Sequence, residues 1–255
     1  MTRRESHFSD AELPLFAAAK PAPAAGSGAD RPSHAIGDHR QRLSERFRDR
    51  GAPALADDEL LELLLFRALP DRDVAPLARA LLDRFGDFNG VLSAPAPLLL
   101  EQPGIDPAAV TALKLVEAAA HRLARARVLH RCAISSWEAL LDYCRTTMAH
   151  LDTEHFRVLF LDRQNVLIAD EEQGRGTVNH VPVYPREVAK RALELNASAL
   201  ILVHNHPSGD PTPSDSDVAM TDRIRAAVEA LDITLHDHLV IGRGREVSFR
   251  DAGLL

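Results

Sequence analysis

The sequence ALILVHNHPSGDPTPSDSD, residues 199–217, passes from a short apolar run into a polar loop that contains three prolines. The apolar run 199–203 predicts a buried strand. Side chains at positions i and i+2 of a strand point to the same face, so His204 and His206 are expected to emerge side by side. Ser214 is expected to cap a following helix, which places Asp217 in its first turn. Two imidazoles and one carboxylate can therefore converge where the strand ends and the helix begins.

This combination of side chains predicts a metal site. Zinc accepts histidine and carboxylate ligands, and three protein ligands with a water in the fourth position are typical of a catalytic zinc centre. The prolines stiffen the loop and Gly209 eases its turn, which lowers the entropy cost of holding Asp217 near the histidines. We expect one Zn²⁺ per chain, held by His204, His206 and Asp217, with the pKa of its bound water lowered to about 7.

A hydrolytic zinc centre also needs a proton acceptor that is not a ligand. Glu154 is the candidate, because it precedes a predicted strand at 156–161 whose end could meet the loop after residue 203. Ser214 has two compatible roles. Its hydroxyl can cap the helix, worth about 1 kcal/mol. It can also donate a hydrogen bond to the oxyanion of a tetrahedral intermediate, worth about 3 kcal/mol in the transition state. Glu154 and Ser214 are thus the expected catalytic residues.

The residues around this stretch alternate between strand and helix patterns. Strands are predicted at 156–161, 166–169, 178–183, 199–203, 234–241 and 246–249. Helices are predicted at 137–144, 185–196 and 215–231, the first capped by Ser135 or Ser136. A hairpin turn is expected at 242–245. Such a pattern is typical of the α/β class, and we expect a three-layer α/β/α domain with a mixed sheet over residues 133–255.

Residues 36–130 have helical periodicity and are expected to form a small all-α domain. Gly51 is expected to end a first helix, Asp57 or Asp58 to cap a second, and residues 74–85 to form a third. The turn within 98–107 resembles a helix-hairpin-helix, in which backbone N–H groups bind nucleic-acid phosphate. Asp106 stands where that motif has a second glycine. The favoured interpretation is therefore an ordinary helix that Asp106 caps and that begins at the next residue, a proline.

Composition sets limits on the ends and partners of the chain. Residues 1–35 are rich in Ala, Pro, Gly and Ser, and we expect a disordered tail, with a partner-binding arm as the alternative. The chain has 255 residues, is 45% hydrophobic and carries a net charge of −7. That charge gives no support to nucleic-acid binding by the whole chain, although it allows a local basic patch.

Cysteine content and hydropathy bear on the compartment. Cys132 and Cys144 are too few for a disulfide framework, and buried free thiols in a reducing compartment are the expected state. No apolar run is long enough to span a bilayer. The segment 13–19 is a poor signal peptide, because it is short, contains proline, follows two acidic residues and ends at a lysine. We therefore expect a cytoplasmic protein with no membrane partner.

The residues of the opening stretch resemble a known motif. Their order is His-x-His-Pro, six residues, Ser, two residues, Asp, which matches the JAMM motif of the MPN-plus metalloproteases. Glu154 stands where that family has its upstream glutamate. The chain bears a closer resemblance, from about residue 37 onward, to the bacterial RadC (UPF0758) family. The shared residues are Glu154 with Phe156, the segments 160–162 and 185–188, the core 204–209, and Asp237 with His238.

This resemblance implies a fold, a cofactor and a reaction. The fold is a cytidine-deaminase-like MPN domain that binds one zinc ion through His204, His206 and Asp217, with Glu154 activating the water. The reaction of MPN-plus relatives is hydrolysis of a peptide or isopeptide bond, so the expected partner is a peptide or protein substrate. Asp237 and His238 could either support the zinc ligands or form a buried polar pair.

Two other functions are compatible with the same residues. The RadC name implies a supposed role in DNA repair, with DNA either bound by the helical domain or cut at the metal site. The basic run Arg122, Arg125, Arg127 and Arg131 fits such binding, and it fits a solvated helix face equally well. The third possibility is a partner-binding module with a structural zinc, although such a site would need neither Glu154 nor Ser214. The oligomeric state does not follow from the sequence.

Overall fold

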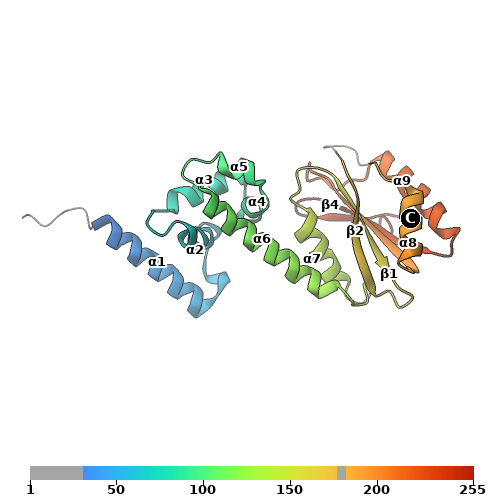
Figure 1. Ribbon diagram of the computed structural model, residues 1–255, viewed down its shortest axis with the longest axis horizontal. Coiled ribbons are helices and arrows are strands. Elements are labelled where there is room, and N and C mark those ends of the chain that lie inside the picture. Colours follow the sequence, from blue (N-terminus) through green and yellow to red (C-terminus); the bar gives the residue numbers. More distant parts are fainter. Residues whose placement is uncertain (1–30, 177–181) are drawn as a thin grey trace, which may run out of the picture.

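The computed structural model describes residues 31–176 and 182–255, and Figure 1 shows them as two parts joined by a long helix. We call residues 31–128 the helical lobe and residues 137–255 the sheet domain. An all-α region followed by an α/β region is the predicted order, and the fold class is confirmed. Within the described ranges, no helix is both long and apolar enough to cross a bilayer.

The helical lobe is a series of helices with short connections. They are α1 (Arg31–Arg50), a 3₁₀ turn (Ala52–Ala54), α2 (Asp57–Ala68), α3 (Ala75–Phe85), α4 (Phe88–Ser93), α5 (Ala96–Leu100) and α6 (Pro107–Val128). Gly51 follows α1 with a φ of 75°, a left-handed conformation that glycine adopts at little cost, and the predicted end of the first helix is confirmed. The apolar faces of the helices share one core, which includes Leu43, Leu61, Leu65, Leu81 and Leu113.

Asp106 caps α6 in the ordinary way. Its Oδ1 accepts a hydrogen bond from Ala109 N at 2.8 Å, and Pro107 occupies the first helical position. The favoured interpretation of this turn is therefore confirmed. A phosphate that approached the start of α6 would meet the Asp106 carboxylate, because that side chain already occupies the Ala109 N–H group.

The sheet domain contains α7 (Trp137–Met148), β1 (His155–Leu161), β2 (Leu167–Arg175), α8 (Pro185–Glu194), β3 (Ala199–Asn205), α9 (Asp215–Glu229), β4 (Thr234–Ile241) and β5 (Glu246–Ser248). These strands form one five-stranded sheet in the order β2-β1-β3-β4-β5. β3 and β4 run parallel and the other neighbours run antiparallel, so the sheet is mixed, as predicted.

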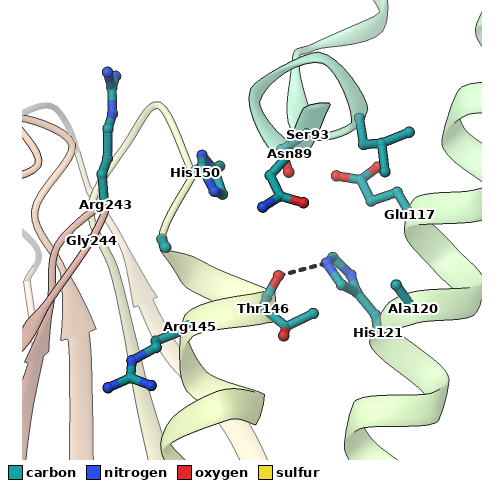
Figure 2. Close-up of a pocket in the computed structure, with 12 residues that line it drawn as sticks. Asn89, Ser93, Glu117, Ala120, His121, Arg145, Thr146, His150, Arg243 and Gly244 are labelled. Atoms are coloured by element: carbon teal, nitrogen blue, oxygen red, sulfur yellow. Dashed lines mark hydrogen bonds between the residues drawn. The ribbon is translucent and has the colours of Figure 1, made fainter. Parts of the chain in front are cut away.

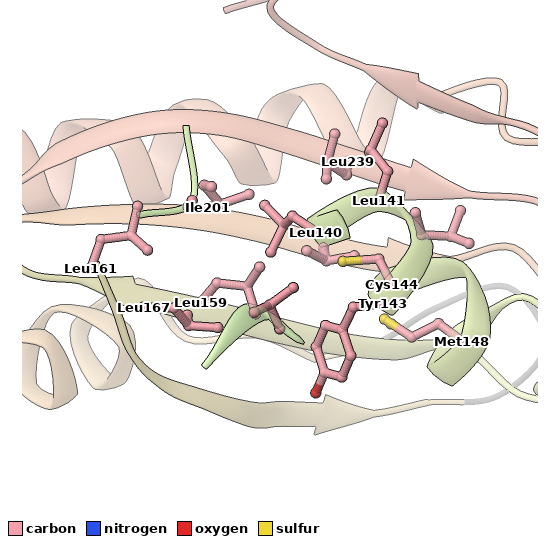
Figure 3. Packing of buried hydrophobic residues seen from close by; sticks show 14 of the residues in the cluster. Leu140, Leu141, Tyr143, Cys144, Met148, Leu159, Leu161, Leu167, Ile201 and Leu239 are labelled. Atoms are coloured by element: carbon pink, nitrogen blue, oxygen red, sulfur yellow. The ribbon is translucent and has the colours of Figure 1, made fainter. Parts of the chain in front are cut away.

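Helices cover both faces of this sheet, which produces the three predicted layers. α7 packs on one face, where Leu140 and its neighbours contact strand residues such as Leu159 (Figure 3). α8 and α9 cover the other face, where Ile224 packs among strand residues such as Leu202. β3 is buried along its whole length because it lies in the middle of the sheet, between two helical layers. Its C-terminal end is therefore held firmly in place.

α6 packs in both parts of the molecule. Ala109 and Leu113 belong to the core of the helical lobe, whereas Val128 at the other end belongs to the core beneath α7. Between these ends, His121 Nε2 donates to Thr146 O on α7 at 3.1 Å (Figure 2). A cavity of about 420 Å³ lies at this junction and is lined by residues of α4, α6, α7 and the β4–β5 turn. Since one helix serves two cores, the domain limits 36–130 and 133–255 stay predictions.

Several predicted boundaries were wrong. The N-cap of α2 is Ala56, one residue before the predicted pair, because its N–H reaches Glu59 Oε2 at 3.1 Å and the helix already begins at Asp57. α1 begins at Arg31, so the last residues of the expected tail 1–35 are helical, whereas residues 1–30 lie outside the described residues. Most of the predicted strand 178–183 also lies outside them, and residues 182–183 are not in a strand.

Candidate metal centre

The three predicted ligands meet at one end of the sheet. His204 lies near the C-terminal end of β3, between β1 and β4. His206 follows, and its N–H donates to Ile241 O at the end of β4, 3.0 Å away. Asp217 lies in the first turn of α9. The strand-to-helix junction predicted from the sequence is present, with His204 buried and with His206 and Asp217 partly exposed.

The ligand atoms of these residues lie as close together as a single ion requires. His204 Nε2 is 3.0 Å from His206 Nε2 and 3.4 Å from Asp217 Oδ1. His206 Nε2 is 3.5 Å from Asp217 Oδ2. Three atoms at about 2.0–2.1 Å from one tetrahedral ion would be separated by about 3.3 Å. The three side chains could therefore hold one metal ion.

A series of buried hydrogen bonds determines which nitrogen of His204 faces the site. Thr221 Oγ1 lies 2.6 Å from Asp217 O and 2.6 Å from His238 Nδ1. Because a carbonyl only accepts, the Thr221 hydroxyl donates to Asp217 O and accepts from His238 Nδ1. Burial lowers the pKa of His238 well below its ordinary value, so its ring is neutral and its Nε2 accepts from His204 Nδ1 at 2.8 Å. A lone pair therefore remains on His204 Nε2, toward the site.

His206 is oriented in the same sense by its loop. Its Nδ1 donates to Asp210 O at 2.8 Å, so a neutral His206 ring also has its lone pair on Nε2. Two imidazole lone pairs and a carboxylate then face one another with no hydrogen between them. Only a cation stabilises such a group, either a metal ion or a proton on His206. The hydrogen bond with Asp217 accordingly raises the pKa of His206, whereas burial lowers the pKa of His204.

Ser214 caps α9 and contacts the ligand carboxylate. Asp217 N donates to Ser214 Oγ at 3.2 Å, and Ser214 N donates to Asp217 Oδ2 at 2.7 Å, which confirms the predicted cap. The Ser214 hydroxyl also donates to Asp217 Oδ2 at 2.6 Å. Burial raises the pKa of Asp217, but its interactions with the two neighbouring histidines and with the Ser214 hydroxyl outweigh burial, and the net pKa lies far below the ordinary range. Asp217 is therefore an ionised carboxylate held by a helix cap.

Glu154 is brought near His206 by the register of two strands. β1 and β3 are antiparallel, and their pairing ends where Phe156 lies opposite His204. Glu154 is two residues before Phe156 and His206 is two residues after His204, so this register directs both side chains toward the same end and face of the sheet. The ring of Phe156 stacks on that of His204, with centroids 6.1 Å apart. The charge of Glu154 contributes to the raised pKa of His206. Glu154 thus lies close enough to His206 for its charge to act on that ring, although it comes from a distant part of the sequence.

Asn205 holds the backbone on both sides of Glu154. Its Oδ1 accepts from His155 N at 2.8 Å, and its Nδ2 donates to Thr153 O at 3.0 Å. Asn205 is buried, and its role is not among those predicted from the sequence. The signal was present nonetheless, because a polar residue between two ligands at the end of an apolar strand needs a buried partner. Thr221 was missed as well, and its signal is its position one helical turn after a ligand.

Asp237 and His238 have different roles in the structure. His238 touches a ligand, as described above. Asp237 instead accepts hydrogen bonds from Ser248 Oγ at 2.5 Å and Arg250 N at 3.1 Å, so it organises the chain after β5. His236, next to Asp237 on β4, is half-buried, and its Nε2 lies 2.6 Å from Asn165 Oδ1.

The loop of residues 206–214, between β3 and α9, packs tightly against the β4–β5 turn. Gly209 has a φ of +87°, and Arg243 N donates to its carbonyl at 3.3 Å. A Cβ on Gly242 would lie 2.4 Å from that carbonyl oxygen and 2.8 Å from Pro211 Cδ, closer than real Cβ atoms approach. Glycine is therefore required at position 242 to keep Asp210 O in place as the partner of the His206 ring.

Comparison with known proteins places the sheet domain in a described group. Residues 134–254 match the family model of the RadC-like JAB domain. The chain is 70% identical over 220 residues to a UPF0758 protein of Ruegeria pomeroyi, an alignment that covers 86% of this chain and 98% of the relative. It is 71% identical over 213 residues to a UPF0758 protein of Rhodobacter capsulatus, covering 84% of this chain and 100% of the relative. Neither relative's name states an activity.

Proposed function

The chain belongs to the RadC (UPF0758) family, and on that basis we propose that it is a zinc-dependent hydrolase that cleaves peptide or isopeptide bonds. A JAB domain fits a metallohydrolase, and the cluster of His204, His206 and Asp217 could hold a metal ion. The choice of zinc is part of the proposal. It is supported by two imidazoles and one carboxylate, a ligand set that suits a four-coordinate ion with one open position.

One observation carries the proposal, namely that a carboxylate lies beside the ligand cluster without belonging to it. A structural zinc site is closed by four protein ligands and needs no neighbouring base. Three candidate ligands converge here, and the charge of Glu154 acts on one of them, His206. Asn205 pins the backbone on both sides of that glutamate. Three ligands and a positioned base favour catalysis over a structural role.

The residues of this chain can be assigned steps in amide hydrolysis. A bound zinc ion would polarise the scissile carbonyl and make a water more acidic. The Glu154 carboxylate would accept a proton from the attacking water and pass it to the amide nitrogen as the C–N bond breaks. The exposed Ser214 hydroxyl lies between Asp217 Oδ2 and Ser216 Oγ, at 2.6 and 2.7 Å. It would turn from them to donate to the oxyanion.

Metal content and peptide cleavage test the proposal together. The chain should bind about one zinc ion by elemental analysis, in line with its three-ligand site. It should also cleave a member of a peptide and isopeptide library, read by mass spectrometry. Glu154→Gln should keep the metal and lose about 10²–10⁴-fold in rate, as expected for removal of a general base. Substrates that stay bound to this variant would then identify the natural target by trapping.

The matched control is Glu138→Gln, on the exposed face of α7, which should change neither metal content nor cleavage. His204→Ala should lose both. The proposal fails if the chain binds no stoichiometric zinc, if metal content is unchanged in His204→Ala, or if Glu154→Gln cleaves as fast as the parent chain.

A second candidate function is DNA binding or cleavage. Its support is the exposed set Arg122, Arg125, Arg127 and Arg131, none of which forms an ion pair with residues 36–176 or 182–255. Binding through this set should weaken steeply with salt and should be lost when Arg122 and Arg125 are both replaced by Glu. No retention of DNA at low salt would exclude this candidate, and the capped turn at Asp106 offers it no help.

We also propose a cytoplasmic location. Both cysteines are free, Cys144 being buried in the core beneath α7 and Cys132 partly exposed. Free thiols are typical of a reducing compartment. Fractionation of cells that express the tagged full chain would test this, and recovery in a membrane or secreted fraction would contradict it.

A further inference from the structure

A groove on the helical lobe has a mainly apolar floor. It encloses about 820 Å³ between α1, α2 and the helices that pack against them. Phe47 of α1 lies in it with 43% of its surface exposed. The rest of the floor consists of half-buried apolar side chains, namely Leu60, Leu63, Leu64, Phe88 and Val116. A concentration of apolar surface such as this is typical of a site that another segment covers.

Arginines surround this floor. Arg40, Arg48 and Arg67 line the groove, and none of them forms an ion pair with any residue of the described part of the chain. The neighbouring Arg46, outside the groove, is paired with Glu59 at 2.7 Å. The groove therefore suits an occupant with both acidic and large apolar side chains. A nucleic-acid backbone would use the arginines but would leave the apolar floor exposed.

The chain itself contains a segment of this chemistry. Residues 8–16, FSDAELPLF, carry four large apolar side chains and two carboxylates, and they lie outside the described residues. Residues 17–30 connect this segment to the start of α1 and can span about 45 Å when extended. Arg48 lies roughly 25 Å along α1 from Arg31, at the helical rise per residue. The segment can therefore reach the groove of its own chain.

We propose that residues 8–16 dock in this groove of the same chain. Phe8, Leu13, Leu15 and Phe16 cover the apolar floor, and Asp10 and Glu12 face the arginines. Covalent connection favours this occupant over a segment from a second copy, because a short linker provides an effective concentration of about a millimolar. The proposal is independent of the hydrolase function, since the groove and the metal centre share no residue.

Photo-crosslinking in the full chain tests the docking directly. A benzophenone derivative of phenylalanine replaces Phe16, the protein is irradiated, and the crosslinked peptides are identified by mass spectrometry. We expect crosslinks to peptides that contain Leu63 or Phe88, about tenfold above those from the same probe at Ala24 in the connecting segment. Mixing isotopically labelled and unlabelled chains distinguishes crosslinks within one chain from those between two.

Each outcome of this experiment decides the proposal. Crosslinks to the groove within one chain support it. Crosslinks to the groove between labelled and unlabelled chains identify a second copy as the occupant and overturn it. Absence of groove crosslinks, or equal labelling from Phe16 and Ala24, overturns it as well.

A charge exchange tests the role of the arginines and controls for misfolding. Arg48→Glu combined with Arg67→Glu should reduce the groove crosslink about fivefold, as expected from the loss of exposed ion pairs. Adding Asp10→Arg and Glu12→Arg to that variant should restore it, which a general loss of structure would not allow. If the arginine variant keeps the crosslink, or if the exchange restores nothing, the charge pairing that we propose is wrong.

Discussion

The buried and the solvent-facing sides of the candidate metal centre differ in the burial of their residues. On the buried side, His204, His238 and Thr221 are at most 3% exposed, and both rings lie near Phe156. On the solvent side, His206 and Asp217 belong to a loop and a helix start and remain partly exposed. Because buried polar groups must all be paired, the first side has a single pattern of donors and acceptors, whereas the second side can exchange protons with solvent.

This difference also determines how the two sides titrate. Burial lowers the pKa of His204 and of His238, so both rings resist protonation. The hydrogen bond with Asp217 raises the pKa of His206, which makes it the first imidazole of the site to take up a proton. The buried side therefore orients the His204 ring, and on the solvent side a proton on His206 would compete with any bound metal ion.

The largest expected effect comes from removing one ligand from each side. His204→Ala and His206→Ala should both lose the metal, but only His204→Ala should destabilise the metal-free chain strongly, by about 2–4 kcal/mol. The reason is that it opens a cavity and leaves His238 Nε2 without its donor. His206→Ala should cost less than about 1 kcal/mol. Urea denaturation in the presence of a chelator measures both, and equal losses would remove the contrast between the two sides.

The next largest effect is expected from replacing His238, which supports the His204 ring but is not itself a candidate ligand. His238→Phe removes the acceptor of the His204 Nδ1 proton and should weaken metal binding about 10–100-fold, the range found when such supporting residues are replaced. His238→Gln can accept from His204 and donate to Thr221, and it should retain most of the affinity. Competition with a chromophoric chelator measures the affinities. Equal weakening in both variants would mean that packing matters and proton placement does not.

The dependence of stability on pH should have opposite signs on the two sides, each group contributing up to about 1.4 kcal/mol per pH unit. Because burial lowers the pKa values of His204 and His238, both rings contribute their full stabilisation to the fold above about pH 6.5, the ordinary imidazole pKa. This stabilisation is lost as the pH falls below that value. The raised pKa of His206 means that its contribution is present below that value and is lost as the pH rises.

Denaturation of the metal-free chain, measured at pH values below and above the ordinary imidazole pKa, tests the direction of each stability change. His238→Gln should reduce the loss of stability on the acid side, and His206→Gln should reduce the loss on the alkaline side. A single variant that flattened both sides would show that the two sides titrate as one unit.

The smallest expected effect is at the exposed cap. Ser214→Ala should destabilise the chain by about 1 kcal/mol through loss of the α9 cap, with metal content unchanged. Ser214→Thr keeps a hydroxyl and should cost less. If hydrolysis is established, a fall in rate of about 10²-fold or more in Ser214→Ala would support the oxyanion role, because a cap alone does not produce it. An unchanged rate would limit Ser214 to the cap.

Local features of the centre could be predicted from the sequence because they depend on short spacing. The histidine pair follows from the period of a strand, and the Ser214 cap with Asp217 follows from helix geometry. The N-cap of α2 was harder to predict, because three acidic residues follow one another there and only Glu59 accepts a hydrogen bond from the residue before the helix. The contact between His236 and Asn165 does not follow from local spacing, because Asn165 lies in a turn far away in the sequence.

By itself, then, the sequence determined the order of the elements, the mixed α/β class and the set of side chains able to hold a metal ion. Only the tertiary structure decided which residues support that set. The pairing of β1 with β3 brings the charge of Glu154 near His206, and Asn205 holds the chain around Glu154. Thr221 and His238 direct a lone pair of His204 into the site. Periodicity acts between near neighbours, whereas strand register and buried hydrogen bonds join residues that burial alone brings together.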